Sequence, residues 1–385
     1  MYQIETLHAG DMAELLLLLN TAFSGDPNSH RFEAILPKMW FDDEEHMEKH
    51  YVIRENGKMV STVGIYPFTV TIAQEPFVFA TVGNMGTAQE ARGKGYLNAL
   101  YTNANAVLET LGVDVARLGG KRSRYARFGY EPCGCMYRFT IARHNAMEFF
   151  KKQALPVLTL QEIKPDDTAA LSQVRRLYAK NGIAAHRGDD RDLYLTLISA
   201  QCVPYAAYDG EEMVGYFTAQ DGHIYEAAAN HPISLANMLC RFAADHEKGA
   251  SVRIPPDRVE DLRIMASFCE GMAQEIPSHY KIINWAKVTN ALLQLKAQTI
   301  APLIDGELIL DIEGYSNIQI RVIGGKGECQ KTDQPADLTL SACEASRFLF
   351  GVLPPYIAAA VPAEKAAFVA ANFPLPLYTH TLDKS

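Results

Sequence analysis

The sequence predicts a protein of the α/β and α+β classes built from three units. At 385 residues the chain exceeds what one hydrophobic core usually organises, so two or three domains are expected. Between Thr81 and Tyr130, a strand, a glycine-bearing turn, an apolar helix and a second strand follow one another. The order of parts after residue 155 echoes this α/β arrangement, and it changes after residue 280.

The first unit, residues 1–150, is predicted to begin with a strand over 2–8 and a helix capped by Asp11. Residues 31–50 are expected to be helical. Asn56-Gly57 between two apolar runs predicts a β-hairpin, and strands continue to residue 87. Together with the central stretch, these elements predict an α/β domain that is complete by Arg143.

Two histidines in the 31–50 segment have a spacing that suits a metal pair. His46 and His50 lie four residues apart, but Glu44, Glu45, Glu48 and Lys49 surround them. We therefore interpret them as part of a solvated helix face, and the sequence predicts no metal site.

The central stretch carries the pattern with the clearest chemistry. Its strand covers 81–87, its turn is Arg92-Gly93-Lys94-Gly95, and its helix ends at Gly112. The helix is predicted from an apolar stripe at helical period: Leu97, Leu100, Tyr101, Ala104, Val107, Leu108 and Leu111. A short strand over 113–118 and the aromatic segment from Tyr125 to Tyr130 follow.

A glycine turn that opens a helix directly after a strand can bind an anion. The first helical N–H groups lack partners, the helix dipole is positive there, and glycines let a phosphate approach the backbone. Arg92 and Lys94 add positive charge. An ordinary strand–helix turn fits this segment equally well. Neither the Walker pattern nor the dinucleotide Gly-x-Gly-x-x-Gly pattern is present.

The downstream segment favours the anion site. Arg92-Gly93-Lys94-Gly95 resembles the coenzyme A loop of the GNAT acetyltransferases, Arg/Gln-x-x-Gly-x-Gly/Ala, with Leu97 where glycine or alanine is usual. Tyr125-Ala126-Arg127-Phe128-Gly129-Tyr130 resembles the second motif of that family. In length and order of parts, the whole chain is similar to the enhanced intracellular survival (Eis-like) branch, which also has a bulky residue at the Leu97 position.

The resemblance also predicts the folds of the other two units. Residues 151–275 are expected to form a second, degenerate GNAT-like lobe, because Ala227-Ala228-Ala229-Asn230-His231-Pro232 stands where the loop would be. An unrelated α/β insert is the alternative. Residues 276–385 are expected to form a domain like the sterol carrier protein, with a glycine hairpin at 324–327 and a mostly helical segment over 354–369.

Composition restricts the possible partners. The net charge of −9 disfavours nucleic acid and anionic membranes and suits a cationic substrate. The seven scattered cysteines, with Cys133 and Cys135 two apart, are expected to be reduced, which fits a cytoplasmic protein. No apolar run reaches the length of a membrane span, and residues 1–5 do not resemble a signal peptide.

The resemblance implies acetyl-CoA as cosubstrate and a primary amine as acceptor. Backbone N–H groups of Arg92, Gly93, Lys94, Gly95, Tyr96 and Leu97 would hold the diphosphate. Met85, Gly86 and Thr87 would bind the pantetheine, with the Met85 N–H as oxyanion donor. Tyr125 would protonate the leaving thiolate, although a packed aromatic residue is the alternative reading. Phe23, Asp26 and Trp40 would line the acceptor site.

The base is expected at the end of the chain. In the resembling branch, the α-carboxylate of the last residue serves as base, which would be Ser385 here. The tail from Asn372 carries Pro374 and Pro376 and is apolar early, so it is expected to be docked. Asp383 as base, or a tail that is only a strap, are alternatives.

The sequence therefore predicts an acetyl-CoA-dependent N-acetyltransferase that uses direct ternary-complex transfer. The acceptor could be an aminoglycoside, a polyamine or a lysine-type amine, and the resemblance implies a homo-oligomer, trimeric or hexameric. The alternative is a non-catalytic lipid-binding or regulatory protein acting through the C-terminal domain.

Overall fold

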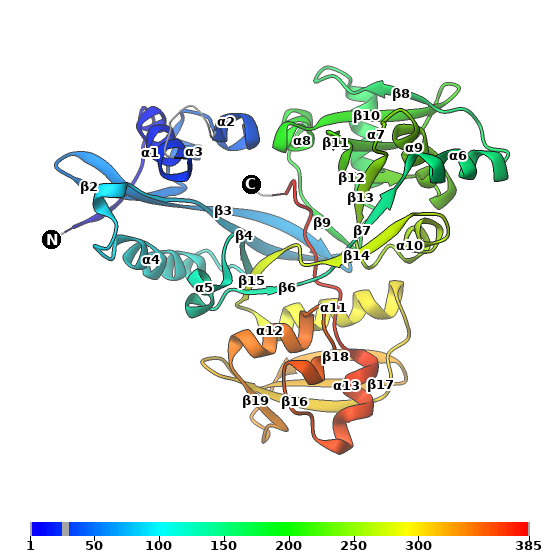
Figure 1. Cartoon of the computed structure of the whole chain (residues 1–385). Coiled ribbons are helices and arrows are strands. Elements are labelled where there is room, and N and C mark those ends of the chain that lie inside the picture. Colours follow the sequence, from blue (N-terminus) through cyan, green and yellow to red (C-terminus); the bar gives the residue numbers. More distant parts are fainter. Residues whose placement is uncertain (1, 25–30, 384–385) are drawn as a thin grey trace.

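A computed structural model describes residues 2–24 and 31–383, and within these residues the strands form three sheets (Figure 1). The first sheet has eight strands in the order β1-β2-β3-β4-β5-β15-β6, with β9 on β3. Its strands are β1 (Ile4–Thr6), β2 (His50–Glu55), β3 (Lys58–Ile72), β4 (Glu75–Thr87), β5 (Val115–Leu118), β6 (Glu131–Cys133), β9 (Ile183–Ala185) and β15 (Ser278–Ile282). The expected Asn56-Gly57 hairpin joins β2 to β3.

Helix α4 (Tyr96–Thr110) covers one face of this sheet. Four residues of the predicted stripe are buried: Leu100, Tyr101, Ala104 and Leu108 pack in one cluster with Ala80 and Val82 of β4 and Ala116 and Leu118 of β5. Leu97 and Val107 are half-buried, and Leu111 at the end of the helix is exposed. Gly112 follows the helix with a φ of +62°, a left-handed conformation that glycine adopts without strain. The central strand–turn–helix–strand prediction is therefore confirmed.

The segment expected to be one helix over 31–50 is instead broken. It contains α2 (Phe32–Ile35), a 3-10 turn at Pro37–Met39 and α3 (Glu44–Met47). Pro37 lacks a backbone N–H and prevents a continuous helix. His50 belongs to β2 and is fully buried, so the solvated helix face predicted for it is wrong.

Two segments belong to a different unit from the one predicted, so the predicted domain boundaries change. β15, from the segment assigned to the third unit, lies between β5 and β6, where His279 pairs with both Leu118 and Pro132. β7 (Met136–Ile141), assigned to the first unit, belongs to the second sheet, and α6 (Arg143–Lys152) packs against α9 (Pro232–Ala244) of the same unit. The first domain is therefore not complete by Arg143, because its sheet requires a strand from beyond residue 275.

The second sheet has the order β14-β7-β13-β12-β11-β10-β8. Its remaining strands are β8 (Thr159–Glu162), β10 (Val203–Asp209), β11 (Glu212–Gln220), β12 (His223–Ala229), β13 (Ala250–Ile254) and β14 (Gly271–Glu275). The helices with it are α7 (Thr168–Tyr178), α8 (Asp190–Leu197), α9 (Pro232–Ala244) and α10 (Val259–Ala266). Helix α9 follows β12 through Asn230 and His231, so this unit has a strand–helix turn without the glycines of the first.

The third sheet has the order β18-β17-β16-β19 and packs against α11 (Trp285–Thr299). Its strands are β16 (Gly306–Ile312), β17 (Ile318–Ile323), β18 (Lys326–Lys331) and β19 (Leu338–Leu340). The glycine hairpin predicted at 324–327 joins β17 to β18, with both Gly324 and Gly325 at positive φ.

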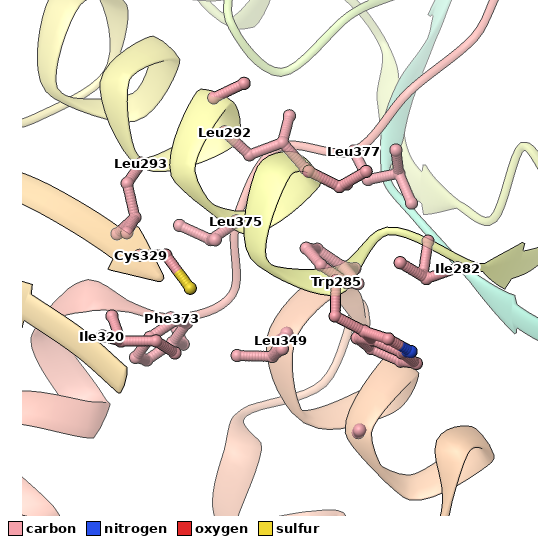
Figure 2. Close-up of a cluster of buried hydrophobic side chains, with 14 of the residues drawn as sticks. Ile282, Trp285, Leu292, Leu293, Ile320, Cys329, Leu349, Phe373, Leu375 and Leu377 are labelled. Carbon is pink, nitrogen blue, oxygen red and sulfur yellow. The ribbon is translucent and has the colours of Figure 1, made fainter. Parts of the chain in front are cut away.

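The core of the third unit continues into the first sheet. Figure 2 shows Trp285 of α11 beside Leu349 of α12 (Ala342–Phe350), and Leu292 of α11 with Phe373, Leu375 and Leu377 of the tail in the same cluster. The cluster also includes Phe77 and Phe79 of β4. Because well-packed cores transmit displacements, the third unit is mechanically connected to the first sheet.

The segment 354–369 is less helical than expected. It contains 3-10 turns at Pro355–Ile357 and Ala363–Lys365 before α13 (Ala366–Asn372) begins. Pro354, Pro355 and Pro362 remove the donors that a continuous helix would need. Throughout the described part of the chain, no helix combines the length and apolarity needed to cross a bilayer.

Candidate functional site

In the first sheet, β4 and β5 pair over only part of their length. The place where the pairing ends, after Thr81 and Arg117, is called the fork. The two strands are parallel and pair from Phe79–Val115 to Thr81–Arg117, where the described ladder ends. β4 continues to Thr87, whereas β5 ends at Leu118. The backbone of β4 beyond Thr81 is therefore not paired with β5.

A cavity of about 640 Å³ lies at this fork. It unites residues from four separate segments: Ala22, Phe23, Met85, Gly86, Thr87, Ala91, Arg92, Gly93, Gly95, Tyr96, Leu97, Asn98, Arg124, Tyr125 and Arg127. Most of the residues predicted to bind the cosubstrate are in this set. The expected loop, the end of β4 and Tyr125 thus meet around one space.

The loop has the conformation that an anion site needs. Gly93 and Gly95 have φ values of +84° and +82°, and Gly95 is the N-cap of α4. A Cβ on either glycine would meet no atom within 4 Å, so the backbone is open to a ligand. The N-terminus of a 15-residue helix therefore faces the cavity without obstruction, and a diphosphate fits there.

Arginines supply the charge at the cavity, and Lys94 does not. Arg92 donates to the carbonyls of Thr87 (3.4 Å) and Ala22 (3.5 Å). Arg127 donates to Asn98 Oδ1 at 2.5 Å. Lys94 instead pairs with Glu55 at 2.8 Å, which raises the pKa of its ammonium group.

The side chain of Lys94 therefore differs from the expectation that it adds positive charge at the loop, because Lys94 does not line the cavity. Tyr96 lines the cavity, and its hydroxyl donates to the same Glu55 carboxylate. The Glu55 carboxylate, in the β2–β3 hairpin, fixes both side chains. Sequence reasoning could not place this partner because it lies 39 residues before Lys94.

Tyr125 is the last residue of the short helix α5 (Arg122–Tyr125) and is 6% exposed. Its ring centroid lies 5.5 Å from that of Tyr101, whose hydroxyl contacts Met85 Sδ. Tyr130 is buried, while Phe128 is half-buried and stacks on Tyr101. Burial raises the pKa values of Tyr101 and Tyr130. Neither of these two tyrosines lines the cavity, whereas Tyr125 and Tyr96 do.

Gly120 makes room for Tyr125, and sequence reasoning missed it. Its φ is +151°, and a Cβ there would overlap the Tyr125 ring. The only sequence signal is the Gly119-Gly120 pair directly after the β5 run. A larger residue at 120 would have to displace the phenol from the cavity.

A buried polar chain supports the β4 segment beside Met85. Asn84, at a φ of +48°, donates from Nδ2 to the Tyr66 hydroxyl at 2.5 Å. That hydroxyl then donates to His50 Nε2 at 2.6 Å. A Cβ on Gly64 would overlap the Tyr66 hydroxyl, so the glycine is required. The three strands β2, β3 and β4 are thereby locked next to the cavity.

The residues predicted to line the acceptor site do not lie together. Phe23 lines the cavity and is 53% exposed, with its ring 4.9 Å from that of Phe32. Trp40 is 8% exposed and stacks on His50 at 5.7 Å, so it belongs to the core and not to the cavity. Asp26 lies outside the described residues. Aromatic character alone could not distinguish a lining ring from a core ring.

The tail runs from the third unit to a position between the other two (Figure 1). Arg117, the last residue of β5 that pairs with β4, donates to Thr379 Oγ1 at 2.7 Å and to the carbonyls of His380 and Asp383, both at 3.2 Å. Ala116 and Leu118 pack toward α4, so the alternation of a strand puts Arg117 on the other face of the sheet. The docked tail that was predicted is present through Asp383.

A buried charge cluster holds the same tail. Arg187 donates to Asp383 Oδ1 at 2.8 Å and to Glu226 at 2.7 and 2.5 Å. Tyr178 donates to Asp383 at 2.6 Å, and Tyr216 donates to Glu226 at 2.7 Å. Burial alone would raise the pKa of Glu226, but Arg187 and His380 lower it to about 2. Asp383 is thus committed to a structural ion pair, while Ser385 lies outside the described residues.

Comparisons with known proteins agree with this geometry. Residues 3–133 match the model of the acetyltransferase (GNAT) domain. The N-terminal part of the chain is therefore similar to GNAT acetyltransferase domains. The match covers about a third of the chain and ends at Cys133, the last residue of β6, where the chain leaves the first sheet. Among curated proteins, none matches.

Solved structures share the fold over nearly the whole chain. A GCN5-related N-acetyltransferase from Anabaena variabilis is 14% identical with a TM-score of 0.67, covering 99% of this chain and 98% of that one. One from Kribbella flavida is 13% identical with a TM-score of 0.65, covering 97% and 96%. Eis1 from Mycobacterium abscessus is 14% identical with a TM-score of 0.63, covering 97% and 98%.

The buried His50 gives a pH prediction. Burial lowers the pKa of His50 to about 4, whereas the unfolded chain titrates near 6.5. Between these values the unfolded state binds more protons, so the free energy of unfolding should decrease as the pH falls from 6.5 toward 4. His50→Gln should reduce this slope by up to about 1.4 kcal/mol per pH unit, measured by urea unfolding at several pH values.

His144→Gln, at an exposed position of α6, serves as the control and should keep the wild-type slope. An unchanged slope in His50→Gln would contradict the burial and neutral state assigned to His50.

Proposed function

We propose that this protein is an acetyl-CoA-dependent N-acetyltransferase that transfers an acetyl group directly to a primary amine. The observation that carries the proposal is the cavity at the β4–β5 fork. There the open N-terminus of α4, the arginines and the phenol of Tyr125 face one space. Enzymes of this domain family use acyl-CoA donors, and acetyl is the acyl group that we propose.

Backbone groups of the loop would bind the donor. The N–H groups of residues 92–97 would hold the diphosphate, and Arg92, Arg124 and Arg127 would balance its charge. Met85, Gly86 and Thr87 line the side of the cavity toward the fork, where a pantetheine chain would continue the strand pairing. The Met85 N–H would polarise the thioester carbonyl.

Tyr125 would donate a proton to the departing thiolate. The Tyr125 side chain is nearly buried, its ring packs against that of Tyr101, and Gly120 leaves the room that the ring occupies. The orientation of the Tyr125 ring is therefore defined. A phenol is a weak acid, so this proton transfer requires close positioning. Positioning of this kind is what the surrounding contacts supply.

The base would be the α-carboxylate of Ser385. Arg117 holds the Asp383 carbonyl beside the point where the pairing of β4 with β5 ends. Arg117 and Tyr125 belong to opposite faces of the sheet, because Tyr125 packs in the α4 cluster. A base reaching in from the tail and an acid on the α4 side would therefore act on opposite sides of the acetyl group. The alternative base Asp383 is disfavoured by its ion pair with Arg187.

The acceptor class is a cationic amine. The net charge of −9 attracts cations, and the exposed ring of Phe23 at the cavity offers a surface for an amine-bearing substrate. Aminoglycosides, polyamines and lysine side chains all fit this description.

The likeness to Eis1 over nearly the whole chain supports assignment to the Eis-like branch. With that assignment come a second lobe that has lost its donor loop, a C-terminal unit like the sterol carrier protein, a homo-oligomer and a cytoplasmic location. The non-catalytic alternative has one observation in its favour, an apolar cavity of about 630 Å³ bordered by Val352, Val369 and Phe373. The intact loop and the lining position of Tyr125 favour catalysis.

Tyr125→Phe should lower kcat by about 10²–10⁴ while leaving the acetyl-CoA dissociation constant unchanged, because it removes only the acid. The assay is amine-dependent release of free thiol from acetyl-CoA, with spermidine, kanamycin and a lysine peptide as acceptors. Tyr208→Phe, in β10 of the second sheet, is the matched control and should behave as wild type. Wild-type turnover in Tyr125→Phe would remove Tyr125 from the mechanism.

Residues appended after Ser385 should abolish turnover and leave acetyl-CoA binding intact, because they convert the terminal carboxylate into an amide. The same residues added at the N-terminus should have no effect. Full thiol release by the C-terminally extended protein would exclude the α-carboxylate as the base.

A further inference from the structure

Helix α12 of the third unit is connected to the segment that carries Tyr125 in two places: directly at the residue after the tyrosine, and through Glu131 at a residue before it. Arg347 of α12 donates from Nη1 to Glu131 Oε1 at 2.6 Å, and Arg122 donates from Nε to the same oxygen at 2.8 Å. Arg122 lies three residues before Tyr125. Cys343, one turn earlier in α12, donates from Sγ to the carbonyl of Ala126, the residue after Tyr125, at 3.5 Å.

The shared carboxylate is the centre of this bridge. Glu131 of β6 is 1% exposed, whereas the side chains of Arg122 and Arg347 are 55% and 34% exposed. Hydrogen bonding to Glu131 raises the pKa of Arg122. A buried carboxylate that bridges two guanidinium groups fixes both in position, since removal of either leaves charge poorly compensated.

The segment needs such support because it cannot order itself. α5 has four residues, its N-cap Lys121 makes no side-chain cap, and Gly120 with its positive φ precedes it. An isolated helix of this length is unstable in water. The orientation of the Tyr125 ring must therefore come from contacts outside the helix.

We propose that Glu131 is a positioning residue for the reaction, coupling α12 of the third unit to the Tyr125 phenol through Arg347 and Arg122. This inference rests on the proposed role of Tyr125 as the acid. It makes the third unit part of the acid–base machinery, although no α12 residue lines the donor cavity. A displacement of α12 would change kcat by moving Tyr125.

The proposal is tested by a double-mutant cycle between Glu131→Gln and Tyr125→Phe. Glu131→Gln should lower kcat by about tenfold to a hundredfold, the usual cost of misplacing a reacting group, without changing the acetyl-CoA dissociation constant. In the Tyr125→Phe background it should cause no further loss, because the group that it positions is absent. Equal losses in both backgrounds would overturn the proposal in favour of general structural support.

A second measurement does not depend on turnover. Backbone hydrogen exchange over residues 122–128 should be at least about tenfold faster in Glu131→Gln and in Arg347→Met than in wild type. Arg347→Met also serves if Glu131→Gln does not fold. Glu275→Gln is the matched control, because Glu275 likewise bridges two arginines, Arg138 and Arg253, in the second sheet. Unchanged hydrogen exchange over residues 122–128 in Arg347→Met would contradict the proposal that the bridge through Glu131 orders this segment.

A wrong assignment of Tyr125 as the acid and a wrong positioning role for Glu131 give different results. If Tyr125→Phe keeps wild-type turnover, the proposed acid is wrong even when the exchange rates change. If Tyr125→Phe loses turnover and Glu131→Gln does not, the acid stands and the positioning role is wrong.

Discussion

The ion pair between Arg187 and the two carboxylates of Asp383 and Glu226 is the contact on which the assembly of the units depends. Arg187 follows β9, which pairs with β3 of the first sheet. Glu226 belongs to β12 of the second sheet, and Asp383 ends the described part of the tail. Because all three groups are buried, loss of any one leaves an uncompensated charge in a low-dielectric interior. One guanidinium therefore joins the first sheet, the second sheet and the end of the chain.

This constraint is one of several that make the first sheet depend on the rest of the chain. Its sheet is completed by β15, its fork is reached by the tail that Arg187 and Arg117 anchor, and its tyrosine segment is contacted by α12. The glycine loop at the cavity is local to the strand–turn–helix stretch, whereas the groups around the cavity come from the rest of the chain.

Local features of the fold could be predicted from the sequence because their causes are local. Gly93, Gly95 and the α4 stripe act within a few residues of one another, and so do the Asn56-Gly57 and Gly324-Gly325 turns. The strand exchange could not be predicted, since β15 joins β5 from about 160 residues away. The same holds for Lys94 with Glu55, for Glu131 with Arg347, and for His50, whose charged neighbours in sequence suggested exposure although its strand is buried. Ion-pair partners across domains leave no periodic signal in a single sequence.

The most direct test of the central claim, that the fork cavity binds acetyl-CoA through the N-terminus of α4, is isothermal titration calorimetry with two matched glycine variants. Gly95 and Gly314 have nearly equal φ values, +82° and +81°, and neither would bring a Cβ within 4 Å of another atom. Wild type and Gly314→Trp should bind acetyl-CoA with the same dissociation constant, whereas Gly95→Trp should show no binding because the indole fills the phosphate position. Absence of binding by the wild type, or equal binding by Gly95→Trp, would contradict the account.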